Sequence, residues 1–260
     1  MSEQHSEQHG NVKKTTRRPT RRSVLTAGTG VLAGTALSGW AGQLPAMAAA
    51  RGRTVEPTRP PTPTDEDPTP KKTPLSANGW ATEAKADDGG TIWSRAVNGS
   101  DLSVQVRTGD VAAVLLYVVR RFHYEIDALR TGDVVGFRKL GGTSLSSPQS
   151  NQASGTAVAI RGGWYPEGSS GGFFAPQLAV VRDILAVCDG VVRWGGDDER
   201  PYEALFSIDV PPGSPELSTI GSRILGWNQR PGQGAGQLPD PSQPKRRSAA
   251  LALEHTQRGS

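Results

Sequence analysis

The apolar pattern of this chain is confined to one stretch, about residues 78–227, and both ends of the chain are rich in proline or glycine. Segments dense in proline and polar residues do not bury a hydrophobic core. Residues 78–227 are of ordinary single-domain size, long enough to enclose a real core. We therefore predict one folded domain over 78–227, a linker over 51–77 and a disordered tail over 228–260.

Inside that stretch, apolar residues recur at steps of three or four and indicate helices. The first pattern follows Asp110, whose carboxylate we expect to cap the free amides of the first helical turn. The second runs from Pro176 to Cys188, and the third starts after Ser214. Strand-like runs cover residues 102–106, 155–160, 191–194 and 205–210. This mixture predicts an α+β domain with a small antiparallel sheet and flanking helices.

Charge is distributed unevenly along the chain. The formal net charge is +4, yet residues 78–227 carry 13 Lys and Arg against 17 Asp and Glu. The basic excess therefore belongs to the two ends. A nucleic-acid-binding domain presents a basic face within its fold, so we predict no nucleic-acid partner.

The chain has one cysteine, Cys188, so an intramolecular disulfide is impossible. It falls in an apolar helical pattern, which predicts a buried, unreactive thiol. A catalytic cysteine needs a basic partner, and His123 is the only histidine within 78–227. A Cys188–His123 pair is the less favoured alternative, and so few histidines argue against a zinc site built on His.

Residues 20–25 (TRRSVL) resemble the twin-arginine motif of bacterial export signals. A mildly apolar run rich in Gly and Ala follows to about Ala41, and residues 46–48 (AMA) match a small-x-small cleavage pattern. The run falls short of the about 20 apolar residues of a good membrane span. Residues 1–50 therefore predict export by the twin-arginine machinery to the cell wall or the exterior. An uncleaved leader is the alternative, and it is the only membrane contact that we predict.

The segments that flank the domain differ in composition. The linker 51–77 interleaves seven prolines with threonine and charged residues, which favours extended polyproline conformations, as in a stalk or a plain spacer. The tail 228–260 combines Gly, Gln and Pro with a basic cluster at 245–247, and this composition predicts disorder.

Residues 150–160 (SNQASGTAVAI) resemble a signature of the D-alanyl-D-alanine carboxypeptidase-like zinc peptidases, S-x-H-x-x-G-x-A-x-D-[IL]. Residues 202–206 (YEALF) are similar to a second segment of that family, [DE]-x-x-H-F. Other landmarks follow the family's order: residues 78–80 (NGW), 121–125 (RFHYE) and 191–196 (VVRWGG). The resemblance covers most of residues 78–227 and implies the fold of these peptidases.

The resemblance implies zinc ligands at three positions, which in this chain are Gln152, Ala159 and Leu205. It implies a catalytic carboxylate where this chain has Tyr202. A catalytic zinc needs three N, O or S donors and one position left open for water. Ala and Leu offer no donor, and Gln is a poor, neutral one. We therefore predict the scaffold without the chemistry, with no zinc, no other cofactor and no catalytic residue.

Carboxylates near the second segment leave an alternative open, since oxygen ligands from several of them would suit a hard cation. They are Asp197, Asp198, Glu199, Glu203 and Asp209. The favoured interpretation of residues 197–201 is a solvated turn. Aromatic residues also flank a Gly-rich loop, either as a lid over the cleft or as packing anchors. They are Trp164, Tyr165, Phe173 and Phe174.

The resemblance also implies a substrate-holding arginine at Arg138. Arg binds a carboxylate through two parallel hydrogen bonds, and peptidoglycan stem peptides end in carboxylates. Ser150 and Ser154 are further candidates for ligand contacts; the alternative is that they bond the backbone locally as turn residues.

Together these features predict an exported, catalytically inactive carboxypeptidase-like domain. Its expected partner is a peptidoglycan stem peptide or a wall-associated protein. The alternative is an active peptidoglycan peptidase with an atypical metal site.

Overall fold

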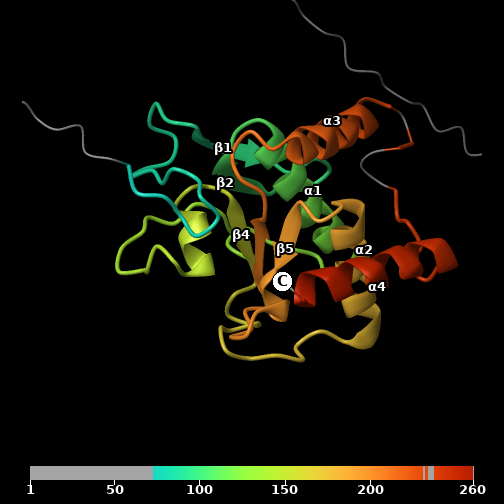
Figure 1. Ribbon diagram of the computed structural model, residues 1–260. Helices are drawn as coiled ribbons and strands as arrows, with labels where there is room; N and C mark the ends of the chain where they lie inside the picture. The colour runs from blue at the N-terminus through green and yellow to red at the C-terminus, as the bar shows by residue number, and fades with distance from the viewer. Residues whose placement is uncertain (1–72, 231, 234–236, 260) are drawn as a thin grey trace, which may run out of the picture. The chain divides into compact units, whose positions relative to one another are not determined.

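The structure, a computed structural model, describes residues 73–230, 232–233 and 237–259. The predicted leader and residues 51–72 of the predicted linker lie outside this part of the chain. The described residues form two antiparallel sheets and four α-helices (Figure 1), which confirms the α+β prediction. No helix within these ranges combines the length and apolarity that crossing a bilayer requires.

A four-stranded antiparallel sheet lies at the centre of the domain, in the order β3-β4-β6-β5. Its strands are β3 (Val134–Val135), β4 (Ala157–Ile160), β6 (Leu205–Ile208) and β5 (Val192–Trp194). Every residue of β4 and β6 is buried. Strands covered on both faces are expected to be apolar throughout, which is why these two were readily predicted from the sequence.

A separate hairpin joins β1 (Ile92–Ala96) to β2 (Ser103–Arg107). The sequence predicts β2 but not β1. In β1 only Ile92 is buried and the next four residues are exposed. Its register is therefore set by pairing with β2 and not by an apolar pattern of its own, so periodicity gives no signal there.

The helix α1 (Asp110–Glu125) has the apolar stripe that the sequence predicts, with Leu115, Val118 and Phe122 fully buried. The prediction that Asp110 caps this helix is wrong. The capping position is Gly109, and no side chain there bonds the first turn. The Asp110 carboxylate instead accepts a hydrogen bond of 2.9 Å from the Ser218 hydroxyl of α3 and so joins two helices.

The helix α2 (Ala175–Val187) begins and ends close to its predicted bounds, and α3 (Pro215–Gln229) starts where predicted. Ser214 caps α3, because its hydroxyl oxygen accepts a hydrogen bond from the Leu217 amide. Cys188 directly follows α2 and is fully buried. Burial raises the pKa of the Cys188 thiol to about 12, so it stays protonated at neutral pH, as an unreactive thiol should.

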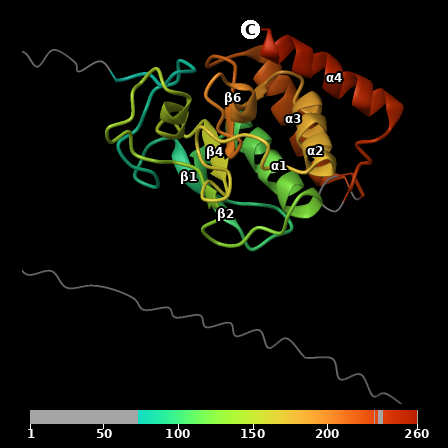
Figure 2. The ribbon, with the colours of Figure 1, turned by 90° about the horizontal axis from the view of Figure 1, so that it is seen from below.

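The predicted disordered tail contains a fourth helix, α4 (Pro244–Arg258), so that prediction is wrong for these residues. Charged contacts hold α4 against the domain, next to α2 (Figure 1). Arg246 bonds Asp183 at 2.5 Å, and Arg258 bonds Asp197 at 3.0 Å. The Gln257 amide donates to the Val192 carbonyl at 2.9 Å, on β5 at the edge of the sheet. Figure 2 shows the four helices together on one side of the strands.

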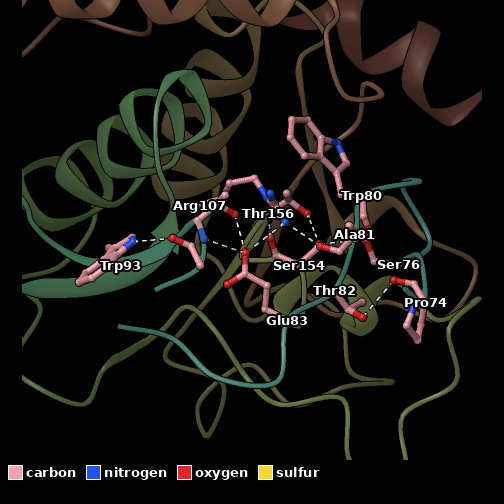
Figure 3. A network of polar contacts seen from close by, with 12 residues as sticks. Pro74, Ser76, Trp80, Ala81, Thr82, Glu83, Trp93, Arg107, Ser154 and Thr156 are labelled. Carbon is pink, nitrogen blue, oxygen red and sulfur yellow. Dashed lines mark hydrogen bonds and ion pairs between the residues drawn. The ribbon is translucent and has the colours of Figure 1, made fainter. Parts of the chain in front are cut away.

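The domain also begins earlier than predicted. Residues 74–77, placed in the linker by composition, are bonded to the domain. Ser76 is buried and donates to the Ser154 hydroxyl at 2.9 Å (Figure 3). The Ala77 amide donates to the Ser150 hydroxyl at 2.9 Å. Leu75 pairs with Ala81 in an isolated bridge. The linker boundary therefore moves to the N-terminal side of Pro74.

Gly221 marks the place where α3 approaches α1 most closely. A Cβ added there would lie 2.6 Å from the Asp110 Oδ1 atom and 2.8 Å from its Cβ. Gly221→Ala gains helix propensity but overpacks this contact, and we expect a net loss of about 1–2 kcal/mol in the free energy of unfolding, measured with urea. Gly226→Ala on the same helix meets no atom within 4 Å and is expected to stabilise by about 0.5–1 kcal/mol. Equal effects of the two changes would contradict this account.

Candidate functional site

A pocket of about 480 Å³ opens at one end of the central sheet, between β3, β4 and the loop that follows β4. Its lining includes Val135 of β3, Ala159 of β4, Gln152 at the end of the 3₁₀ turn η1 (Pro148–Gln152), Arg138 and Tyr202. The volume falls in the range of small-molecule and peptide side-chain sites. We call it the Arg138 pocket.

The resemblance implies zinc ligands at three positions, and two of them, Gln152 and Ala159, line this pocket. The third, Leu205, lies directly opposite Ala159 in the pairing of β4 with β6. Side chains of directly opposed residues lie on the same face of a sheet, so Leu205 is next to Ala159, although it is 1% exposed and outside the pocket lining. The structure therefore groups the three positions at one corner of the sheet.

The Gln152 side chain is buried and already bonded to the backbone. Its amide nitrogen donates to the carbonyls of Val135 at 2.9 Å and Gly136 at 3.0 Å. Its role in the fold is to tie η1 to the end of β3. Of these three positions, Ala159 and Leu205 offer no donor atom, and the neutral Gln152 amide is a poor ligand for zinc.

Tyr202, at the predicted base position, borders the pocket with its hydroxyl close to the loop after β4. A Cβ on Gly162 would lie 2.9 Å from this hydroxyl, so glycine permits the approach. Burial raises the pKa of Tyr202, and the positive charge of Arg138 only partly opposes the shift. At neutral pH the phenol therefore stays protonated, able to donate and accept a hydrogen bond but unfit as a base.

Two arginines line the pocket, and only one is neutralised. Arg161 pairs with Asp127 and lies 3.4 Å from the Asp133 carboxylate. Its guanidinium also lies 4.7 Å from the centroid of the Trp164 ring. Arg138 is exposed, and among the described residues it has no ion-pair partner. The pocket therefore offers one uncompensated cation beside a phenol, with Trp164, 71% exposed, at its border.

Arg161 has a left-handed backbone conformation, with φ of 53°. Such a conformation is uncommon for a residue with a side chain and costs on the order of 1–3 kcal/mol. The ion pairs of Arg161 stabilise this conformation, together with a hydrogen bond of 2.6 Å from its backbone amide to the Asp133 carbonyl. Sequence analysis missed Arg161, Asp133 and Gly162, because they belong to no motif and only the pairing of β3 with β4 brings them together.

The structure does not place Ser150 and Ser154 in the pocket, so their prediction as ligand contacts is wrong. Both are fully buried. The Ser150 hydroxyl donates to the Leu145 carbonyl at 2.9 Å, and the Ser154 hydroxyl donates to the Asn151 carbonyl at 3.0 Å. Figure 3 shows Ser154 between Ser76 and Thr156. They act as turn residues that hold the start of the domain.

Three of the five carboxylates that suggested a hard-ion site, Asp197, Asp198 and Glu203, are engaged elsewhere. Asp197 is bonded by Arg182 and Arg258, and Asp198 by Arg193. Within residues 73–230, 232–233 and 237–259, no group of three or more His, Cys, Asp or Glu is arranged to hold a metal ion.

Glu203 anchors the Gly-rich loop beside the pocket. Its buried carboxylate accepts hydrogen bonds from the Gly171 amide at 2.7 Å and the Gly172 amide at 2.8 Å. In the same loop the rings of Tyr165 and Phe173 stack 4.3 Å apart. These two aromatics are packing anchors, whereas Trp164 and Phe174 are exposed. Glu203 therefore holds the end of the loop at Gly171 and Gly172, and the start of the loop, at Trp164, borders the pocket.

Comparisons of the chain with protein-family models, with curated proteins and with solved structures find no match. The inferences about function therefore depend on the residues and contacts given above.

Proposed function

We propose that this chain is an exported, catalytically inactive carboxypeptidase-like domain, and that its Arg138 pocket binds the carboxylate end of a cell-wall peptide. The observation that carries the proposal is the grouping of Gln152, Ala159 and Leu205 beside an uncompensated Arg138. This corner of the sheet lacks three side chains able to bind zinc. It has a positively charged side chain, Arg138, and a pocket of suitable size.

The ligand class follows from the chemistry of the pocket. An exposed guanidinium binds a carboxylate in a two-pronged arrangement, stronger than a neutral hydrogen bond. The protonated Tyr202 hydroxyl adds a second donor within the same lining. Peptidoglycan stem peptides supply the carboxylate, and export through the leader would bring the domain to them.

Binding of the purified full chain to a stem peptide ending in D-Ala-D-Ala tests the proposal by calorimetry. We expect Arg138→Gln to weaken binding about tenfold or more, since a hydrogen bond to a charged group contributes about 1.5–3 kcal/mol. Lys139→Gln is the matched control, because it removes an equal charge from the adjacent, exposed residue, which is not among the described lining residues of the pocket.

A peptide that carries a C-terminal amide sharpens the test. It lacks the carboxylate, so it should bind wild type as weakly as the normal peptide binds Arg138→Gln, and the two changes together should add little. The proposal is wrong if the full chain retains neither stem peptide nor intact peptidoglycan, or if Arg138→Gln and Lys139→Gln weaken binding equally. Release of D-Ala by chain carrying one zinc, abolished by a chelator, would instead establish the peptidase alternative.

A further inference from the structure

Arg120 of α1 is a buried cation without a carboxylate partner. It is 6% exposed, and its Nη1 atom donates to the Asn228 side-chain oxygen at 2.7 Å. Its guanidinium lies 5.4 Å from the centroid of the Tyr117 ring. In the described part of the chain no Asp or Glu lies within ion-pair distance of it. Burial lowers the pKa of Arg120, and the negative charge of Glu125 only partly opposes the shift.

The next residue of α1 is a buried arginine whose charge is neutralised by carboxylates. Arg121 is 4% exposed and pairs with Glu125 and with Asp183, the latter at 2.8 Å. Glu125 is thus engaged with Arg121, and it acts on the charge of Arg120 only from beyond ion-pair distance. Burying a charge without a counter-ion costs free energy. A negatively charged ligand bound at Arg120 would reduce this cost.

Arg120 borders a second pocket, of about 250 Å³, which we call the Arg120 pocket. It lies between the turn after β1, the face of α1 from Gly109 to Arg120 and the end of α3. Arg95, Asn98 and Asn228 also line it, and none of its described lining residues is acidic. The pocket shares no lining residue with the Arg138 pocket.

Arg95 adds a second positive charge without a neutralising partner. It is exposed and makes no ion pair with any described residue. The acidic side chain that interacts with its charge is Asp87, whose carboxylate accepts hydrogen bonds from the Ser94 amide at 2.6 Å and Gln105 at 2.8 Å. The two arginines therefore leave the Arg120 pocket with an excess of positive charge.

The backbone at the start of α1 favours the same kind of ligand. Gly109, Ala112 and Ala113 line the pocket, and no side chain caps this 16-residue helix. Free amides at a helix N-terminus attract anions. The Asp110 carboxylate also lies in this first turn and keeps its negative charge, but it is bonded to Ser218 of α3 and is not part of the lining.

We propose that the Arg120 pocket binds a phosphate group. Two uncompensated guanidiniums match a phosphate, which carries close to two negative charges at neutral pH, better than a singly charged carboxylate. Arg presents a planar fork of donors that fits phosphate oxygens, and the amides of Asn98 and Asn228 supply further donors. The phosphate is either a free ion or a unit of a phosphodiester polymer. The polymer unit carries one negative charge and presents two unesterified oxygens.

Titration of the purified full chain with sodium phosphate, followed by calorimetry, tests the proposal. Sodium chloride keeps the ionic strength constant. We expect saturable binding to wild type that Arg95→Gln weakens about tenfold. Arg95 is exposed, so this variant keeps the fold even if a change at the buried Arg120 does not. Arg120→Lys keeps the charge but loses the fork, and it should also weaken binding. Arg130→Gln, at an exposed arginine outside both linings, should bind as wild type does.

Two outcomes overturn the proposal: no saturable heat with phosphate, or equal weakening in Arg95→Gln and Arg130→Gln. A second arm identifies the source. Tighter binding of a poly(glycerol phosphate) chain than of inorganic phosphate, per phosphate unit, indicates the polymer, and equal or weaker binding of the chain indicates the free ion. Because the two pockets are separate, the stem-peptide affinity of Arg95→Gln should remain that of wild type. Failure here is thus distinguishable from failure of the proposed function.

Discussion

Replacing Gln152 by His, Ala159 by Asp, Leu205 by His and Tyr202 by Glu is expected to give the chain a zinc site. Gln152 and Ala159 line one pocket, and Leu205 is paired with Ala159 on the same face of the sheet. The substitutions supply two imidazoles and one carboxylate as ligands, with a second carboxylate at the base position. Activity need not follow, because it also depends on the partners that orient metal ligands.

Metal analysis after equilibrium dialysis measures the result, with one zinc per chain expected in the quadruple variant. Zinc at 100 times its dissociation constant should raise the free energy of unfolding by about 2.7 kcal/mol. The double variant Gln152→His, Ala159→Asp is the control, since two ligands should hold zinc about tenfold more weakly or worse. A variant that unfolds without metal is still informative, because zinc should then restore its folded circular dichroism spectrum. A folded quadruple variant that takes up no zinc contradicts the geometry.

Asp197→Asn should cost about 1.5–3 kcal/mol in the free energy of unfolding, because it removes charged hydrogen bonds and leaves the buried Arg182 with only Glu254 as a counter-ion. The Asp197 side chain is 1% exposed. It accepts hydrogen bonds from Arg182 at 2.6 Å and Arg258 at 3.0 Å, so it connects α2 to α4. Asp88→Asn is the control. Asp88 and its partner Lys85 are 62% and 74% exposed, and pairs of that kind contribute less than about 1 kcal/mol.

The effect of Asp197→Asn should depend on pH in a defined direction. Burial acts to raise the pKa of Asp197, but the bonds from Arg182 and Arg258 outweigh it and lower the pKa below its ordinary value of 3.8. The stabilisation is therefore fully present above pH 3.8 and is lost as the pH falls through the lowered folded-state value. Urea unfolding at a series of pH values should show a constant difference between wild type and Asp197→Asn above about pH 5, narrowing in stronger acid. A difference that widens on acidification contradicts this assignment.

The helices α1, α2 and α3 were predictable because an apolar stripe buries each of them. The helix α4 was not, since in it only Ala250 and Gln257 are buried. Ion pairs with residues far away in the chain hold it, among them Arg246 with Asp183. A pattern of charges along one segment does not reveal which distant carboxylates it meets.

Part of the candidate site was also predictable from the sequence. The motif positions Gln152, Ala159 and Tyr202 line one pocket together with Arg138. Ser150 and Ser154 have the residue types of ligand contacts, but a hydroxyl is equally suited to bond the backbone of a turn, and the sequence alone does not decide between the two. The sequence did not predict Arg120 as a site residue, because only the structure shows that it is buried and has no carboxylate within ion-pair distance.

The attachment of residues 76–78 to the turn 150–156 has a mechanical consequence. Ser76, Ala77 and Asn78 each donate a hydrogen bond into this turn, which also carries Gln152. Tension applied through the preceding chain, as in a domain tethered at its N-terminal side, would reach the wall of the Arg138 pocket before it reached the helices. A load on the preceding chain and the shape of the pocket wall would thereby be coupled through these hydrogen bonds.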